Sequence, residues 1–220
     1  MKIYPSILTD SIEVVQKQLD LVAGIDEVET VQIDMIDGFF ADNLTVTPLD
    51  LVEIEFGDVT VDLHLMVDEP LDFVFEAIAI KNVLPIRAMI AQVERMSFQS
   101  EYIQEIKRRG WKVGLSLDLY TPAEAIDVAS WDHLDIVQLM TVNAGFQDQQ
   151  FQAQALKKIA ELKPFIEAQG REIEVIVDGG VKEETAAQLV AVGVTGVSVG
   201  SALWKSTNLE QTIARLSENG

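Results

Sequence analysis

Short apolar runs alternate with longer amphipathic runs along the whole chain, and this alternation constrains the fold more than any other feature of the 220 residues. Short apolar runs predict buried strands, and apolar residues at helical spacing between them predict helices that pack against those strands. We expect strands over residues 3–8, 28–35, 59–67, 83–90, 112–117, 134–141, 173–177 and 194–199. We expect helices over residues 11–22, 49–54, 71–80, 98–109, 151–169 and 182–192, with another opening at Thr121 and a last one ending near Leu216.

Eight strand–helix units with no low-complexity linker between them predict one closed (β/α)8 barrel, formed by residues 1–220 as a single domain. The length is at the small end for that fold. A doubly wound open sheet is the alternative, and the eight repeats favour closure.

Polar side chains share one face of several predicted strands. Side chains alternate along a strand, so in a barrel one set faces the helices and the other faces the interior. In the second strand Val31 and Ile33 are apolar, whereas Gln32 and Asp34 share the opposite face. Buried polar groups are costly unless they are paired or functional, and barrels carry their active sites at the C-terminal strand ends. The polar residues nearest those ends are Ser6, Asp34, His64, Asp118 and Asp178.

Asp34, His64 and Asp178 end three different strands and are expected to converge. The set can bind a divalent cation through nitrogen and oxygen atoms. Its two carboxylates can also act as bases on opposite faces of a substrate, as a proton transfer next to a carbonyl requires. The alternative is that each is a hydrogen-bonded polar residue of the barrel interior with no chemical role.

Glycines follow the last strands. Gly179–Gly180 follows the seventh strand and Gly200–Ser201 the eighth, while Asn143–Phe146 follows the sixth and is placed to close the pocket. Loops after strands seven and eight of a barrel often hold phosphate through backbone N–H groups, which need no Lys or Arg. Such glycine pairs also occur in simple turns, which is the alternative for each pair alone.

Charge and composition exclude several classes of function. Thirty-six acidic residues against sixteen basic ones give a formal net charge of −20. This excludes nucleic-acid binding by phosphate neutralisation and disfavours anionic membrane surfaces. No apolar run approaches the roughly 18 residues of a membrane span, and no signal peptide is recognisable, so a cytoplasmic protein is expected. The chain has no cysteine, and no lysine ends a predicted strand, which argues against thiolate and Schiff-base chemistry.

The sequence resembles the ribulose-phosphate 3-epimerase family over nearly its whole length. The resemblance is carried by Pro5–Leu8; by Asp34–Gly38 with Asn43–Thr45 and Pro48; by Asp62–Val67; by Thr121–Pro122; by Leu139–Asn143 with Gly145–Phe146; by Val177–Val181; and by Val199–Ala202. It implies a barrel of the ribulose-phosphate-binding type that interconverts D-ribulose 5-phosphate and D-xylulose 5-phosphate. It also implies self-association into a homo-oligomer.

The resemblance further implies roles for individual residues. Asp34 and Asp178 would exchange the proton at C3 through an enediolate. A divalent cation (Zn, Fe, Mn, Co or Mg) would be held by Asp34, His64 and Asp178, with Gln32 beside them. The substrate would contact Ser6, His64, Met66, Met140, Gly145, Gly179, Gly180, Gly200 and Ser201.

The chain also departs from the family pattern. Gln32 and Gln92 stand where the family has histidines, and Gln147–Asp148 replaces a glycine pair. Ala144 and Ile36 are smaller changes, replacing a proline and a methionine. Gln32 predicts weaker cation binding or a harder metal. Asp148 places a carboxylate near the substrate's phosphate, unless it faces solvent. Two alternatives therefore stay open: an epimerase of a related ketose phosphate such as allulose 6-phosphate, and a non-catalytic relative that binds a sugar phosphate.

Overall fold

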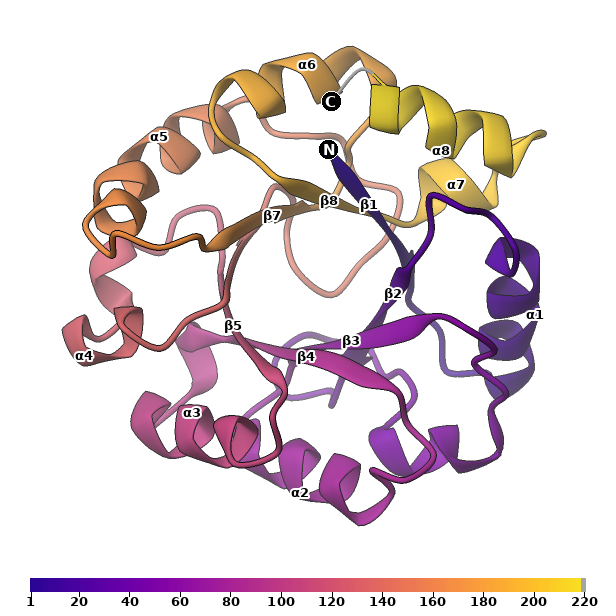
Figure 1. Cartoon of the computed structure of the whole chain (residues 1–220), viewed down its shortest axis with the longest axis horizontal. Helices are drawn as coiled ribbons and strands as arrows, with labels where there is room; N and C mark the ends of the chain where they lie inside the picture. Colours follow the sequence, from indigo (N-terminus) through magenta and orange to yellow (C-terminus); the bar gives the residue numbers. More distant parts are fainter. Residues whose placement is uncertain (219–220) are drawn as a thin grey trace.

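The computed structural model describes residues 1–218, and eight parallel strands in them close into a barrel in which each strand pairs with the next and β8 pairs with β1 (Figure 1). The strands are β1 (Lys2–Ile7), β2 (Thr30–Ile36), β3 (Thr60–Met66), β4 (Ile86–Gln92), β5 (Lys112–Leu117), β6 (Ile136–Met140), β7 (Glu174–Asp178) and β8 (Gly196–Val199). The predicted closed (β/α)8 barrel is confirmed, and the open sheet is wrong.

Helices surround the barrel (Figure 1). They are α1 (Ile12–Val22), α2 (Leu71–Ala79), α3 (Gln99–Lys107), α4 (Val128–Trp131), α5 (Gln154–Glu167), α6 (Glu183–Ala191), α7 (Ser201–Trp204) and α8 (Leu209–Glu218), with 3₁₀ turns η1 (Pro48–Glu53), η2 (Val93–Arg95) and η3 (Ala123–Ala125). Within residues 1–218 none of them has the length and apolar character needed to cross a bilayer.

Three helices differ from the expectation, and the one expected over residues 49–54 is the 3₁₀ turn η1. The helix expected to open at Thr121 is replaced by η3 and the four-residue α4, because Pro122 has an extended backbone (ψ 153°) and precedes only a 3₁₀ turn. The last helix is divided into α7 and α8. Asn208 separates them, and its Oδ1 accepts from the backbone N–H of Gln211 at 3.0 Å, which caps the new helix.

Alternation along the strands separates two layers of side chains. Ile33, Leu63 and Val177 belong to the large apolar core between strands and helices. Tyr4, Ile90 and Ile136 belong to a smaller cluster with Ala88 and Ile176. The remaining interior positions include buried polar side chains: Ser6, Gln32, Asp34, Asp62, His64, Ser116, Gln138, Asp178 and Ser198.

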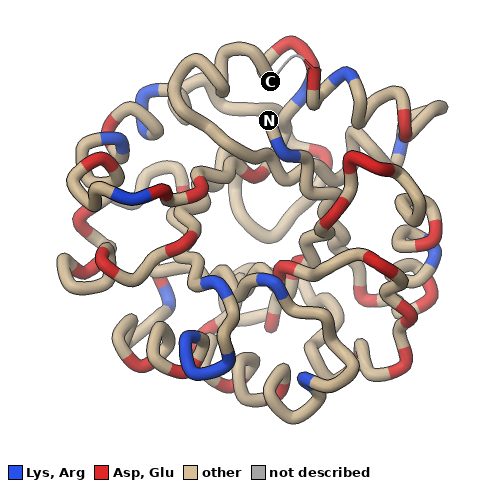
Figure 2. Tube along the Cα trace, in the orientation of Figure 1, with Lys and Arg blue, Asp and Glu red and all other residues tan. Residues whose placement is uncertain are grey.

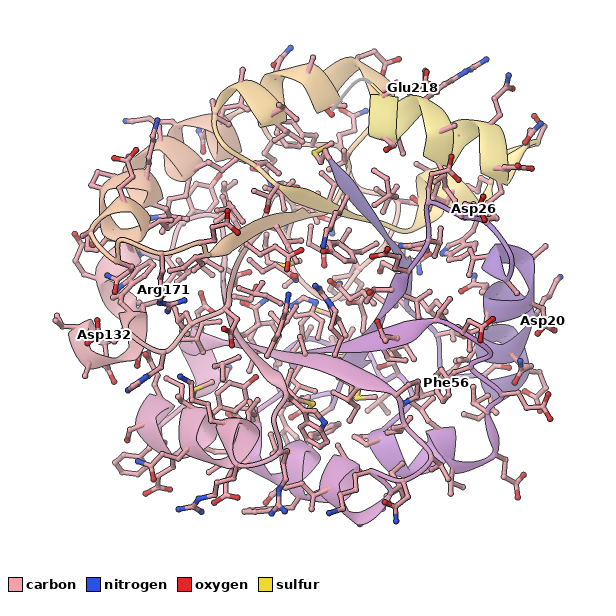
Figure 3. The ribbon with its side chains drawn as sticks, in the orientation of Figure 1. Asp20, Asp26, Phe56, Asp132, Arg171 and Glu218 are labelled. Atoms are coloured by element: carbon pink, nitrogen blue, oxygen red, sulfur yellow. The ribbon has the colours of Figure 1, made fainter. Side chains whose placement is uncertain are left out.

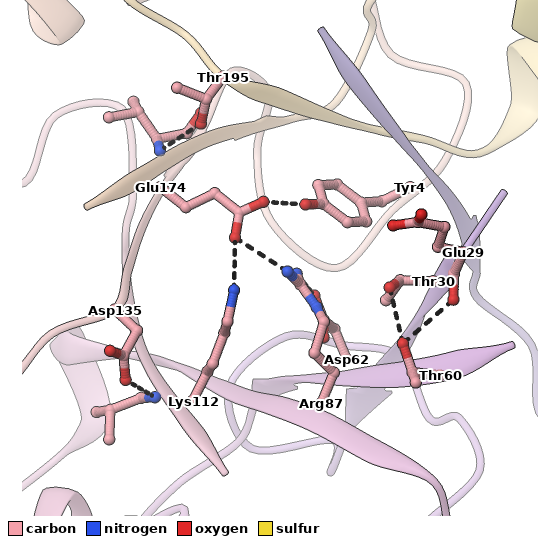
Figure 4. Close-up of polar contacts among 12 residues, drawn as sticks. Tyr4, Glu29, Thr30, Thr60, Asp62, Arg87, Lys112, Asp135, Glu174 and Thr195 are labelled. Carbon is pink, nitrogen blue, oxygen red and sulfur yellow. Dashed lines mark hydrogen bonds and ion pairs between the residues drawn. The ribbon is translucent and has the colours of Figure 1, made fainter. Parts of the chain in front are cut away.

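An ionic cluster joins polar side chains near the N-terminal ends of the strands (Figure 4). Arg87 Nε donates to Asp62 Oδ1 at 2.8 Å, and its Nη1 donates to Glu174 Oε2 at 2.9 Å. The Tyr4 hydroxyl donates to Glu174, and Lys112 Nζ lies 3.5 Å from Glu174 Oε2. The Arg87 guanidinium also lies 4.8 Å from the centroid of the Tyr4 ring. The polar interior at this end is therefore paired within the protein, which leaves the other end for a ligand.

The negative charge is distributed around the molecule, with Asp and Glu on most of the surrounding elements (Figure 2). Asp20 on α1, Asp132 after α4 and Glu218 at the end of α8 are exposed and project outward from the barrel (Figure 3). Charge at these positions favours solubility and lies away from the barrel interior.

Candidate active site at the C-terminal ends of the strands

A cavity of about 370 Å³ opens at the C-terminal end of the barrel. Strands β1, β2, β3, β6, β7 and β8 contribute to its wall, and the loops after β6, β7 and β8 complete it. The structure gathers ten of the predicted site residues there: Ser6, Asp34, Met66, Met140, Gly145, Asp178, Gly179, Gly180, Gly200 and Ser201.

Asp34, His64 and Asp178 meet at the floor of this cavity. Asp34 on β2 pairs in register with His64 on β3, and His64 Nδ1 lies 2.9 Å from Asp34 Oδ1 and 3.4 Å from Asp178 Oδ2. One ligand atom from each residue lies within 4.8 Å of the others. His64 is fully buried and does not line the cavity. The geometry therefore places His64 against the two carboxylates, as a cation ligand would be. His64 was also expected to contact the substrate, but it does not reach the cavity wall.

Gln32 lies among the same three residues. Its Nε2 donates to Asp34 Oδ1 at 2.8 Å and to Asp178 Oδ2 at 2.6 Å, and it lies 3.4 Å from His64 Nδ1. The amide therefore links the two carboxylates. Turning the amide by half a turn presents its carbonyl oxygen, the atom that can bind a cation.

Gln92 contacts the opposite side of His64. Its Nε2 lies 3.2 Å from His64 Nε2, and its buried Oε1 has no partner among the described residues. Half a turn of this amide lets Oε1 accept from His64 Nε2–H, so that the Nδ1 lone pair would be available to a cation held between His64 and the carboxylates. The unpartnered oxygen and the Asp–His–Asp donors together fit a divalent cation at this position.

The surroundings of Asp34 and His64 shift their protonation. Burial and the nearby charge of Asp178 raise the pKa of Asp34, while His64 and Ser6 oppose the rise. Ser6 Oγ donates to Asp34 Oδ2 at 2.5 Å. Burial lowers the pKa of His64, but hydrogen bonds and charge from Asp178 and Asp34 outweigh it and raise that pKa to about 9. Asp34, His64 and Asp178 therefore titrate together, and a protonated side chain lies beside an ionised one in this cluster.

Glycine is required where the loops close on the cavity. Gly179 has φ 110°, and a Cβ there would lie 2.3 Å from Val142 Cγ2. Gly180 has φ 64°, and a Cβ there would lie 2.3 Å from the backbone nitrogen of Phe151. Both positions combine a left-handed backbone with close contact, so only glycine is accommodated without strain. The loops after β6 and β7 therefore pack directly against each other beside the cavity.

Gln147 and Asp148, the departures in the loop after β6, both line the cavity. Gln147 Nε2 donates to the carbonyl oxygen of Leu8 at 3.0 Å. Asp148 Oδ1 accepts from Lys205 Nζ at 2.5 Å. Lys182 and Lys205 line the same cavity, and sequence reasoning missed both. The signal for Lys205 was its position four residues after Ser201, one helical turn further along.

Asp118 does not line this cavity. It belongs to a neighbouring recess of about 390 Å³ with Glu94, Tyr120 and Asn143. Burial and the charge of Glu94 raise the pKa of Asp118 to about 6, and the charge of His64 opposes this rise.

Two buried carboxylates at the C-terminal mouth of a (β/α)8 barrel are groups that proton transfer next to a carbonyl requires, and such transfers are the chemistry of many isomerases. The sequence profile described as the ribulose-phosphate 3 epimerase family matches residues 2–204. The chain therefore belongs to the ribulose-phosphate 3-epimerase family.

Individual relatives agree with this assignment. Ribulose-phosphate 3-epimerase of Bacillus subtilis (strain 168) is 32% identical over 220 residues, covering 98% of both chains. The Escherichia coli (strain K12) protein of the same name is 32% identical over 195 residues, covering 88% of this chain and 83% of the other. Among solved structures, a mutant tryptophan synthase α-subunit from Pyrococcus furiosus superposes with a TM-score of 0.68 at 18% identity, covering 99% of this chain and 98% of the other. That likeness concerns the fold alone.

Proposed function

We propose that the protein interconverts D-ribulose 5-phosphate and D-xylulose 5-phosphate by proton transfer at C3. The observation that carries the proposal is the meeting of Asp34 and Asp178 in one cavity, where a histidine and an amide bridge their carboxylates. The two carboxylates come from β2 and β7, and the proposed reaction requires them to act on opposite faces of the substrate.

The two aspartates exchange roles with the direction of the reaction. An epimerisation needs one ionised carboxylate to take the C3 proton and one protonated carboxyl to return a proton on the other face. The raised pKa of Asp34, caused by burial and by the charge of Asp178, favours this singly protonated pair. Ser6 keeps one oxygen of Asp34 oriented through its 2.5 Å hydrogen bond.

The enediolate that forms between the two transfers needs positive charge or hydrogen-bond donors near its oxygens. A divalent cation bound by Asp34, His64 and Asp178 would supply that charge. Gln32 offers the N–H₂ group in this structure and a carbonyl oxygen after rotation. Met66 and Met140 provide apolar wall that excludes water from the carbanion.

The other end of the cavity suits a phosphate. Loop backbone N–H groups at Gly179, Gly180, Gly200 and Ser201 can donate to phosphate oxygens, and Gly145 brings the loop after β6 to the same wall. Such a cradle needs no bulk positive charge, which is why a chain with net charge −20 can hold an anionic sugar.

Deuterium exchange tests the proposed reaction. The protein is incubated with D-ribulose 5-phosphate in D₂O, with Mn²⁺, Fe²⁺, Co²⁺, Mg²⁺ or Zn²⁺ in parallel samples. Deuterium is expected at C3 of both pentulose phosphates by NMR. Absence of exchange with every cation would contradict the proposal and favour the non-catalytic alternative, which predicts ligand binding without exchange.

A second candidate substrate is a ketohexose phosphate such as D-allulose 6-phosphate. Gln147 and Asp148 favour it, because they change the side chains that line the cavity. Comparing kcat/KM for D-ribulose 5-phosphate and D-allulose 6-phosphate decides between the two substrates.

Self-association is a separate proposal, supported by large apolar side chains left exposed in the loop after β2. Phe39 is 78% exposed and Leu44 is 64% exposed. Sedimentation equilibrium of the purified protein measures the state directly, and a monomer at all concentrations would contradict it.

A further inference from the structure

The loop after β6 places a carboxylate where an anion would bind. Asp148 Oδ1 accepts from Lys205 Nζ at 2.5 Å, and both residues line the cavity beside Gly180, Gly200 and Ser201. Hydrogen bonds from Lys205 and Ser201 hold the pKa of the Asp148 carboxyl below its usual range. An ammonium thus meets a carboxylate at the end of the cavity that suits phosphate.

Lys205 is held in place independently of Asp148. Its backbone N–H donates to the carbonyl oxygen of Ser201 at 3.1 Å, which ends the helical turn of α7. The neighbouring Trp204 donates from Nε1 to the carbonyl oxygen of Ser6 at 2.7 Å. This bond ties the turn to β1 at Ser6, the residue whose hydroxyl donates to Asp34. The backbone at Lys205 is therefore fixed, while the Lys205 side chain is 68% exposed and its ammonium is free to change partner.

Hydrogen bonds other than the ion pair also hold the loop after β6. Gln149 Nε2 donates to the carbonyl oxygens of Asn143 at 2.6 Å and Phe146 at 2.9 Å. Gln147 fastens the loop to Leu8, and Asn43 Nδ2 donates to the carbonyl oxygen of Gly145 at 2.9 Å. The loop is therefore fastened at several points besides the Asp148–Lys205 pair, which leaves the Asp148 carboxylate available for another role.

We propose that Asp148 is an internal competitor for the phosphate group of the substrate, and that Lys205 exchanges the Asp148 carboxylate for that phosphate on binding. The inference rests on the proposed function, because it assigns a specificity-determining cation to the phosphate end of that site. An ion pair with both side chains more than half exposed is readily broken. A phosphate monoester carries roughly −1.5 to −2 charges and three acceptor oxygens, so it outcompetes a single carboxylate.

The exchange predicts opposite effects of removing the two partners. Asp148→Asn removes the competitor and should lower the dissociation constant of phosphate about threefold. Lys205→Met removes the cation and should raise it about tenfold, the usual effect of losing a charge-assisted hydrogen bond. A pair that only fastens the loop would make both variants bind more weakly, and a pair without a role would change neither.

Calorimetry measures these constants with inorganic phosphate and with D-ribitol 5-phosphate, a probe that lacks the carbonyl and is not turned over. Lys163→Met and Glu167→Gln are matched controls, because these residues form another exposed pair, with Nζ 3.7 Å from Oε1, on α5. Tighter binding by Asp148→Asn together with weaker binding by Lys205→Met supports the proposal. Weaker or unchanged binding by Asp148→Asn, or unchanged binding by Lys205→Met, overturns it.

Binding of these probes does not depend on turnover. The exchange between Asp148 and Lys205 can therefore fail in a protein that epimerises D-ribulose 5-phosphate, and it can hold in one that does not. Deuterium exchange at C3 reports whether the protein epimerises the substrate, and the two dissociation constants report whether Lys205 changes partner.

Discussion

The side-chain nitrogen of Gln32 lies 2.6 Å from Oδ2 of Asp178, although the two residues come from strands β2 and β7, which do not pair with each other. The same nitrogen donates to Asp34 Oδ1 at 2.8 Å. A neutral amide thus holds the two proposed bases at a fixed separation.

Replacing either base should severely slow deuterium exchange at C3. Asp34→Asn and Asp178→Asn keep the shape of the side chain but cannot take a proton, so the rate should fall about 10²–10⁴-fold. Asp132→Asn, at an exposed position after α4, is the control and should be unaffected. Exchange at close to the parent rate in either site variant reassigns the base.

Gln32→His should change which metal the purified protein carries. An imidazole beside Asp34, His64 and Asp178 completes a four-ligand N/O set that suits Zn²⁺, whereas an amide oxygen favours harder cations. Elemental analysis after purification should show more zinc per chain in the variant than in the parent. Equal zinc in both proteins would show that position 32 does not select the metal.

Gly179→Ala should weaken both folding and phosphate binding. Alanine at this position would have a left-handed backbone, and its Cβ would lie 2.3 Å from Val142 Cγ2. The strain lowers the free energy of unfolding by about 1–3 kcal/mol. Gly193→Ala is the matched control, because Gly193 has φ 98° but nothing within 4 Å of a Cβ. The control should lose stability without any change in the dissociation constant of inorganic phosphate, measured by calorimetry.

Arg87→Met should strongly destabilise the barrel. It leaves Asp62 and Glu174 without their shared cation, and these carboxylates are only 1% and 12% exposed. Breaking a buried pair in this way costs about 3–5 kcal/mol in urea-induced unfolding. Arg108→Met removes a pair with Glu105 in which the Arg108 side chain is 63% exposed, and it should cost less than about 1 kcal/mol. Similar losses in the two variants would mean that the ionic cluster does not stabilise the fold.

Asp118→Asn should raise the melting temperature at pH 7.5 and lose that effect near pH 4. Burial and Glu94 raise the pKa of Asp118 to about 6 in the folded protein. The raised pKa means that ionised Asp118 destabilises the folded state. This destabilisation is complete above pH 6 and disappears as the pH falls toward the pKa of Asp118 in the unfolded chain. A melting-temperature difference that is constant between pH 4 and pH 7.5 would exclude this cause.

The barrel and the position of its site were predictable because both follow from local patterns. Alternation fixes which residues of β2 face inward, and parallel strands bring Ser6, Asp34 and Asp178 to the same end. The helix expected at Thr121 was wrong because the extended backbone of Pro122 depends on the loop around it. The Asp148–Lys205 pair joins residues 57 positions apart, and the Gln32 bridge joins β2 to β7. Such contacts depend on tertiary geometry that the sequence pattern does not contain.

The ionic cluster around Arg87 has a consequence for how this protein can diverge. It holds β1, β3, β4, β5 and β7 together near their first residues, while the candidate site lies at their far ends. Substitutions in the loops that follow the strands therefore leave this ionic cluster intact. Gln147 and Asp148 are changes of this kind, and a barrel arranged in this way can acquire new substrate preferences while its fold persists.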